Sequence, residues 1–267
     1  MIDTGRPLGA TPLPQPPFDV VMLGNGRVGG SLAKALTDTG SRVLALLGRD
    51  DDPSPIARAS LVVIAVPDDA LDEAAGLVAR LGRPGTVVAH TCGMAALEPL
   101  AECGPLVAAI HPAIPVATTE TSFAGAPFGV TCAPGLEVWC EALVASIGGT
   151  AFPVPAEQRV SYHAALAIAS NFTVALAGDA AELTGSFELL VPLMRATVEN
   201  IARLGPEAAL TGPIARGDVG TVRAHLAALP PHLVEPYVVM ARRTLAHTTL
   251  SREQRAVIEA VLGEALR

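Results

Sequence analysis

The chain has 267 residues, of which 50% are hydrophobic and only 16% are charged, and its formal net charge is −8. This length and composition exclude a disordered chain and predict one large or two moderate domains with a substantial buried core. The acidic balance and the lack of any basic run argue against nucleic acid as a main partner.

Membrane, export and metal signals are not apparent. The longest apolar stretch, residues 164–178, is interrupted by polar residues before it reaches the ~18 residues of a membrane span. The first residues lack the basic-then-apolar order of a signal peptide. The four cysteines show no C-x-x-C spacing, which favours reduced thiols over a zinc site. We therefore expect a cytoplasmic protein with no metal and no membrane partner.

A glycine motif near the start organises the chain. Residues 1–17 are rich in proline and predict a flexible tail, and residues 18–23 form an apolar run typical of a buried strand. The next six residues read G-x-G-x-x-G (Gly24, Asn25, Gly26, Arg27, Val28, Gly29), and a helical pattern follows. In such a motif the first glycine makes the turn, the second admits a pyrophosphate and the third lets the helix pack on the strand. The pattern predicts a dinucleotide site, with a plain glycine turn as the alternative.

The end of the second predicted strand, residues 42–47, bears on the choice of nucleotide. An acid there binds the ribose of NAD, whereas an arginine accommodates the 2′-phosphate of NADP. Arg49 comes first after the strand, and Arg27 can join it from the glycine turn, so we expect NADP(H). The acids at 50–52 leave NAD open.

Further apolar runs at residues 61–66, 86–90 and 106–110 alternate with helical segments. This alternation predicts a Rossmann-type, mostly parallel sheet, whose ligands bind where the strands end. The residues at those ends become site candidates: Val66, Pro67 and Asp68, then His90, Thr91 and Cys92, then His111. Two more strands are expected at 128–132 and 150–154, with a helix at 136–147 between them.

After residue 156 helical periodicity dominates. We predict an α/β domain over residues 18–155 and an all-α domain over 156–267. The expected helices span residues 157–183, 187–204, 219–229, 232–246 and 252–266. Ser251 and Gln254 form a capping box for the last helix.

Several segments together resemble a known group. They are GNGRVG at 24–29, AVPDDAL at 65–71, HTCG at 90–93, HPA at 111–113, YHAALAIASNF at 162–172 and LTGPIARGD at 210–218. The chain resembles bacterial Rossmann-like oxidoreductases with a C-terminal domain of unknown function, distant relatives of ketopantoate reductase, pyrroline-5-carboxylate reductase and the β-hydroxyacid dehydrogenases. The resemblance implies NADP(H), a helical domain of the 6-phosphogluconate dehydrogenase type and a homodimer through the helices. Relatives more often carry serine at the position of Cys92.

The proton donor is the point of departure from these relatives. They use a lysine four residues before an asparagine, but if Asn171 is that asparagine, Ala167 takes the lysine's place and Lys34 is the only lysine of the chain. His163 and His111 are then the candidates, because imidazole suits proton transfer near neutrality. Asn171 would orient the substrate.

Arg216 lies in the glycine-interrupted stretch and suits a carboxylate clamp, with Ser170 and Cys92 as further substrate contacts. Each candidate also has a structural interpretation: His163 as a packing residue, His111 as a loop former beside Pro112, Asn171 as a helix cross-link and Arg216 as part of a turn with Asp218, which would cap the next helix.

Two functions follow from these residues. The first is an NADPH-dependent reductase of a small carboxylate with a carbonyl or imine, ketopantoate leading by resemblance and a cyclic-imine acid second. The second is an NADP-binding sensor or accessory protein without turnover, which the missing lysine favours.

Overall fold

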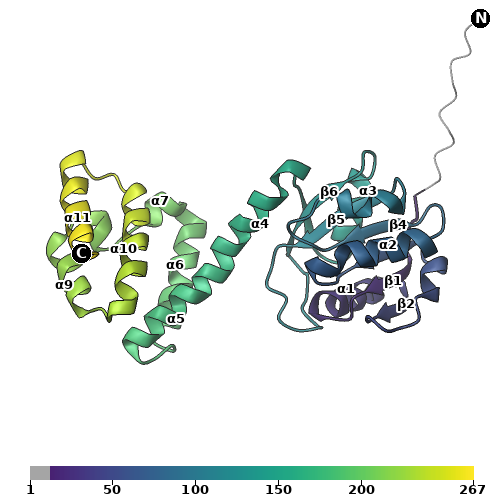
Figure 1. Cartoon of the computed structure of the whole chain (residues 1–267), viewed down its shortest axis with the longest axis horizontal. Helices are drawn as coiled ribbons and strands as arrows, with labels where there is room; N and C mark the ends of the chain where they lie inside the picture. Colours follow the sequence, from purple (N-terminus) through teal and green to yellow (C-terminus); the bar gives the residue numbers. More distant parts are fainter. Residues whose placement is uncertain (1–12) are drawn as a thin grey trace, which may run out of the picture. The chain divides into compact units, whose positions relative to one another are not determined.

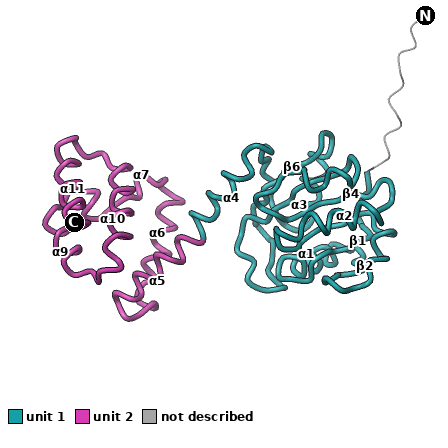
Figure 2. The backbone as a smooth tube through the Cα atoms, viewed as in Figure 1, with its two compact units in different colours: residues 1–170 teal, residues 171–267 magenta. Residues whose placement is uncertain are grey.

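The computed structural model describes residues 13–267 (Figure 1). These residues form two compact units, the first ending at Ser170 and the second running from Asn171 to Arg267 (Figure 2). The change from α/β to helical sequence at about residue 155 precedes this division, because the helix that follows it, α4 (Arg159–Ala167), belongs to the first unit.

A seven-stranded sheet forms the centre of the first unit, as the sequence predicts. The strands are β1 (Asp19–Leu23), β2 (Arg42–Leu47), β3 (Leu61–Ile64), β4 (Val87–His90), β5 (Val107–Pro112), β6 (Pro127–Cys132) and β7 (Thr150–Pro153). Their order is β2-β1-β3-β4-β5-β6-β7. All neighbours run parallel except β5 and β6, which are antiparallel. The sheet is therefore doubly wound, and its chain order reverses between β1 and β3, where such sheets bind ligands.

Helices cover both faces of this sheet, which explains why its strands are continuously apolar. On one face α1 (Arg27–Asp38) and α3 (Glu137–Ser146) pack over alternate strand residues such as Met22. On the other face α2 (Leu71–Leu81) packs over residues such as Val21.

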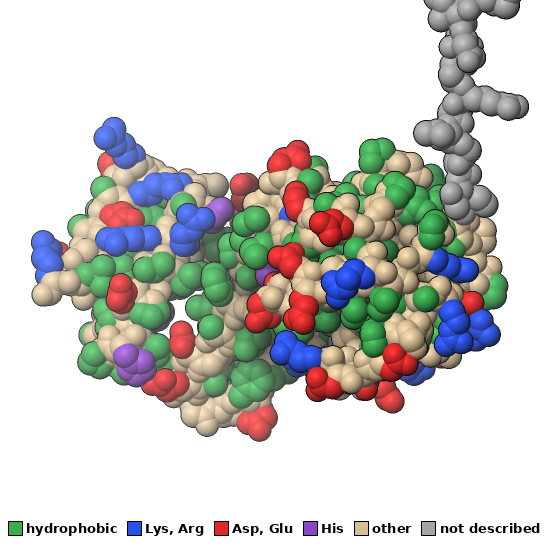
Figure 3. Space-filling view, turned by 45° about the vertical axis from the view of Figure 1, so that its right-hand side comes forward, with side chains coloured by type: hydrophobic (Ala, Val, Ile, Leu, Met, Phe, Trp, Pro, Cys, Tyr) green, Lys and Arg blue, Asp and Glu red, His purple; other side chains and the backbone are tan. Residues whose placement is uncertain are grey.

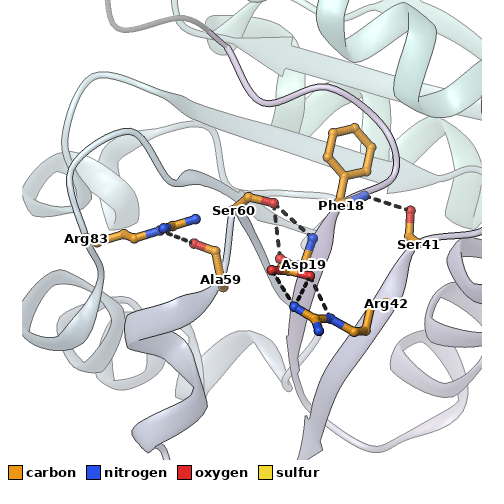
Figure 4. Close-up of polar contacts among 7 residues, drawn as sticks. All are labelled: Phe18, Asp19, Ser41, Arg42, Ala59, Ser60 and Arg83. Atoms are coloured by element: carbon orange, nitrogen blue, oxygen red, sulfur yellow. Dashed lines mark hydrogen bonds and ion pairs between the residues drawn. The ribbon is translucent and has the colours of Figure 1, made fainter.

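The starts of β1, β2 and β3 are fastened to one another (Figure 4). The Phe18 N–H donates to Ser41 Oγ (3.2 Å), and the Asp19 N–H donates to Ser60 Oγ (3.0 Å). The Arg42 guanidinium donates twice to the Asp19 carboxylate, both at 2.9 Å. These bonds set the strand register at the sheet edge opposite the carboxyl ends.

The predicted tail falls partly outside the described residues, since its first twelve residues are not among them. The remainder corrects the expectation of flexibility. Leu13 packs against the sheet core, and the Trp139 Nε1–H donates to the Pro14 carbonyl oxygen at 2.7 Å. Proline fixes the chain in an extended form that reaches this partner without a regular element.

The predicted long helix is interrupted. A π-helical turn, Ile168–Phe172, separates α4 from α5 (Thr173–Thr184). The remaining helices are α6 (Leu190–Leu204), α7 (Pro206–Ala209), α8 (Pro213–Arg216), α9 (Val219–Ala228), α10 (Pro231–Ala246) and α11 (Arg252–Glu264). The short α7 and α8, which the sequence analysis did not predict, begin after Gly205 and Gly212. The predicted capping box of α11 is present.

The second unit has a small core of its own, built from α8 to α11. Its buried members are Ile214, Val222, Val238, Ala241, Leu245, Ile258, Val261 and Leu262. Within α5 and α6, by contrast, only Ala177 is buried.

One helical stretch, Ala156–Thr184, is long and apolar enough to cross a membrane, with a mean hydropathy of 1.4 over 18 residues. The sequence analysis considered uninterrupted apolar residues, whereas a mean hydropathy over 18 residues includes the polar residues among them. Only the length and composition of the helix point to a membrane span, and a core helix of a globular protein can have the same length and hydropathy.

Candidate functional site

The three glycines of the motif differ in whether the fold leaves room for a side chain at their positions. Gly24 has φ of +104°, and a Cβ there would collide with the Ala65 carbonyl; a Cβ on Gly29 would collide with the Gly24 carbonyl. A Cβ on Gly26 would meet nothing within 4 Å. The fold therefore requires the first and third glycines, whereas the second faces open space where the motif places a pyrophosphate.

This open space adjoins the N-terminus of α1. The first helical bond runs from the Gly30 N–H to the Gly26 oxygen (2.8 Å), so the preceding N–H groups have no helical acceptor. The first turn contains no acidic residue. Free N–H groups and the positive end of the helix dipole suit phosphate oxygens. Asn25, Arg27 and Val28 belong to the same turn, which lies at the sheet's switch point.

Two arginines border the turn. Arg27 and Arg49 are exposed, and the guanidinium of neither makes a hydrogen bond or ion pair with any residue from 13 to 267. The acids beside Arg49 are partly engaged: the Asp51 carboxylate accepts from the Gly48 N–H (2.7 Å) and Asp52 accepts from Ser54. Two guanidinium groups are thus open to a phosphate, which agrees with the preference for NADP(H).

The next strand ends continue the site along the sheet edge. Val66, Pro67 and Asp68 follow β3, and the Thr91 N–H after β4 donates to the Ile64 oxygen (3.0 Å). We predict that the nicotinamide contacts Pro67, Asp68 and Thr91. These residues follow the adjoining strands β3 and β4.

An imidazole pair is formed by His111, at the end of β5, and His163, on α4. The rings of His111 and His163 meet edge to face with centroids 5.8 Å apart. A Cβ on Gly93 would lie 2.5 Å from His163 Cδ2 and 3.0 Å from His111 Nε2. His111 Nδ1 lies 3.0 Å from the Tyr162 hydroxyl. The structure thus brings both predicted histidines together, over a glycine that gives their rings room.

Arg159, in the first turn of α4, stabilises the cluster of His111, Tyr162 and His163. The sequence analysis did not predict this role. Arg159 is 1% exposed, and its guanidinium donates to the carbonyl oxygens of Ala95 (3.0 Å), Gly129 (3.2 Å) and Cys92. It also lies 5.6 Å from the centroid of the Tyr162 ring. Because its three acceptors are neutral carbonyls, its charge has no carboxylate partner within the described chain.

Burial and this charge act on the neighbouring imidazole. Burial, followed by the positive charges of Arg159 and His163, lowers the pKa of His111 from 6.5 to about 4. Burial likewise raises the pKa of the Tyr162 phenol. At neutral pH His111 and Tyr162 are therefore uncharged, which suits hydrogen bonding to a neutral carbonyl or imine.

Two neighbouring candidates, Cys92 and His90, make contacts that stabilise the local structure. The Cys92 thiol is 8% exposed, packs in the core and accepts from the Ala95 N–H (3.3 Å), and burial raises its pKa. This packing gives the thiol a structural role, and its contact with substrate stays a prediction. His90 is fully buried and joins the Cys92 N–H to the Ala96 oxygen, so it shapes the loop.

Ser170 and Asn171 fall in the π-helical turn, a feature that is frequent at functional sites. The turn also changes the rotation between Asn171 and His163, so a regular-helix spacing does not describe them. Arg216 ends α8 and is exposed, and its guanidinium has no hydrogen-bond partner among the described residues. Asp218 caps α9 as predicted, accepting from the Thr221 N–H (3.0 Å) and Oγ1 (2.7 Å).

Comparisons with known proteins agree with this architecture. Residues 51–112 match a Rossmann-like domain, and residues 126–244 match the family described as domain of unknown function DUF2520. None of the curated proteins compared with the chain matches its sequence.

Solved structures share the fold. A Bacteroides fragilis protein described as a candidate NADP oxidoreductase is 24% identical with a TM-score of 0.73, over 86% of this chain and 98% of that one. A Thermotoga maritima protein is 22% identical with a TM-score of 0.58, over 93% and 100%. Pyrroline carboxylate reductase of Plasmodium falciparum, solved with NADP, is 11% identical with a TM-score of 0.56, over 93% and 97%. The chain is thus similar to a Rossmann-like domain in its first part and to DUF2520 in its second.

Proposed function

We propose that this protein is an NADP(H)-dependent oxidoreductase that reduces a small carboxylate carrying a carbonyl or imine group. The observation that supports it best is the open space at Gly26, beside the free N-terminus of α1 and two unpaired arginines. The residues present fit a dinucleotide phosphate without rearrangement of the turn.

The bound nicotinamide would supply the hydride, and the chain's own residues do the remainder. The glycine turn and α1 hold the pyrophosphate, and Arg49 with Arg27 binds the 2′-phosphate. His111, at the end of β5, and His163, on α4, supply hydrogen bonds and a proton to the group being reduced. Asn171 and Ser170 orient the substrate.

The preference for an acid substrate rests on charge. The buried Arg159 guanidinium has only neutral acceptors, so its positive field favours an anion near His111. Arg216, exposed at the end of α8, stays our proposed carboxylate clamp. Ketopantoate is the first substrate to test, and a cyclic-imine acid of the pyrroline-5-carboxylate type is the second.

Cofactor choice is tested by titrating the protein with NADPH and NADH and following nicotinamide fluorescence. We expect tighter NADPH binding, which falls towards the NADH level in Arg49→Ala because one phosphate contact is lost. Arg58→Ala, an exposed arginine of the same unit, is the matched control. An equal loss of NADPH affinity in the two variants would contradict the binding of the 2′-phosphate by Arg49.

Turnover separates the enzyme from a catalytically silent NADP-binding sensor. An enzyme oxidises NADPH with one of the two acids, and Asn171→Ala or His163→Ala abolishes this while NADPH still binds. A protein that binds NADPH and turns over neither acid would favour the sensor.

A homodimer through the C-terminal helices is part of this proposal. Helices α5 and α6 present exposed apolar side chains, including Val174 (71% exposed) and Leu193 (64%), and Leu189 (67%) directly precedes α6. Figure 3 shows apolar side chains at the surface between charged ones. A second copy would cover such an apolar hairpin. Light scattering is expected to give a dimer that Leu193→Glu dissociates; a monomeric wild type would contradict it.

A further inference from the structure

The hydroxyl of Tyr162 has a particular place in the cluster. It lies 3.0 Å from His111 Nδ1 and is the hydrogen-bond partner of that nitrogen. Its oxygen rests on Gly129, where a Cβ would collide with it. An imidazole nitrogen is a far stronger base than a phenol oxygen, so the phenol O–H donates to His111 Nδ1.

Such a bond fixes the imidazole tautomer. A neutral imidazole carries one proton, and the nitrogen that accepts a hydrogen bond leaves the proton on the other. Nδ1 is therefore the acceptor and Nε2 carries the proton. Nε2 is the atom that faces the free side of Gly93 beside the His163 ring.

We propose that Tyr162 is the positioning residue that holds His111 as its Nε2–H tautomer, so that His111 presents the proton required by the reduced oxygen or nitrogen of the substrate. This inference rests on the proposed reductase function. It identifies a replacement for the lysine that the chain lacks.

For a carbonyl substrate, the carbonyl carbon receives the hydride. The carbonyl oxygen gains the electron pair of the π bond and takes the proton of His111 Nε2. Nδ1 takes the phenol proton of Tyr162, so the imidazole stays neutral. The phenolate lies near the Arg159 guanidinium, 5.6 Å from the ring centroid, and regains its proton from water. A neutral imidazole that acts as electrophile is known to suit this role.

The test reads the tautomer directly, without cofactor or substrate. In the ¹⁵N-labelled full-length protein, two-bond and three-bond ¹H–¹⁵N correlations distinguish a protonated ring nitrogen from an unprotonated one, and His111→Gln identifies the signals of His111. We expect protonated Nε2 and unprotonated Nδ1 in the wild type. Tyr162→Phe keeps the ring but not the hydroxyl, and is expected to mix the tautomers.

The kinetic arm uses the acid that the wild type reduces. Tyr162→Phe is expected to lower kcat at least ~10-fold with unchanged NADPH affinity, because the wrong tautomer cannot donate. Tyr237→Phe, whose hydroxyl makes an equivalent bond to His225 in the second unit (2.9 Å), is the matched control. A wild-type Nδ1–H tautomer, or an unchanged tautomer in Tyr162→Phe, would overturn the inference. Absence of turnover in a wild type with the expected tautomer would instead count against the reductase function.

Discussion

At the scale of single residues, the glycine turn separates what the fold needs from what a ligand needs. Gly26→Ala is expected to leave the free energy of unfolding within about 0.5 kcal/mol, since its Cβ meets nothing, but to weaken NADPH binding at least ~10-fold. Gly29→Ala is expected to cost about 3 kcal/mol, because its Cβ meets the Gly24 carbonyl. Urea unfolding followed by Trp139 fluorescence, with NADPH titration, measures both.

That design has a clear failing outcome. If Gly26→Ala binds NADPH as the wild type does, no pyrophosphate lies on this turn, and the motif serves only to join β1 to α1.

Gly93 makes a second residue-scale prediction. A Cβ there would displace one or both imidazoles, and a shift of about 1 Å can cost ~100-fold in rate. We expect Gly93→Ala to lower kcat by this order while NADPH affinity holds. The control is Gly76→Ala in α2, whose Cβ would approach only the flexible end of Arg80 at 3.5 Å. Similar kcat values for the two variants would show that the histidines are not used.

The residues that could be predicted from sequence are those whose role is local or follows from strand direction. The glycine turn is one contiguous segment, and the rule that parallel strands end at one edge brings Thr91 and His111 to the same edge of the sheet. Arg159 and Tyr162 act because α4 packs onto the ends of β4 and β6, a tertiary contact with no spacing signal. The only hint was a tyrosine next to His163 in a chain with two tyrosines.

At the scale of elements, the candidate site depends on the contact between α4 and the loop after β4. Arg159 joins α4 to the loop after β4 and to β6 through three carbonyl oxygens. Arg159→Lys keeps the charge but loses the planar fork that reaches all three, and an unpaired buried carbonyl costs about 1–3 kcal/mol. We expect at least ~2 kcal/mol of destabilisation, measured by urea unfolding with Trp139 fluorescence.

The matched control for this attachment is Arg80→Lys, which alters an exposed arginine of α2. If both substitutions leave the unfolding midpoint unchanged, α4 is held by other contacts. The same helix shows a limit of pattern reasoning, since its apolar periodicity predicts continuity to residue 183 and gives no sign of the π-helical turn at Ile168–Phe172.

At the scale of the whole molecule, the two units allow separate measurement, because Trp139 is the only tryptophan and lies in the first unit. Proteins of two units need not unfold in one step. Trp139 fluorescence therefore reports the unit that contains the candidate site, and its buried histidines link that unit's stability to pH.

The sign of this linkage follows from His111. Its folded pKa of about 4 lies below the ordinary 6.5, so the unfolded chain binds the extra proton between these values. The stability of the first unit is therefore full above pH 6.5 and falls as the pH drops towards 4, by about 3 kcal/mol from this group. His90, whose pKa burial also lowers, adds to the fall. Asp19 contributes mainly below 3.8, outside this window.

Urea unfolding at intervals from pH 7 to 4.5 tests the prediction. His111→Gln removes the titrating ring, so its stability should depend less on pH than that of the wild type. His225→Gln, in the second unit, should leave the Trp139 signal unchanged. If the wild type and His111→Gln lose stability in parallel, His111 is protonated in the folded protein as readily as in the unfolded chain. The neutral hydrogen bond from Tyr162 would then not describe the site near neutrality, and the proton would have to come from an imidazolium.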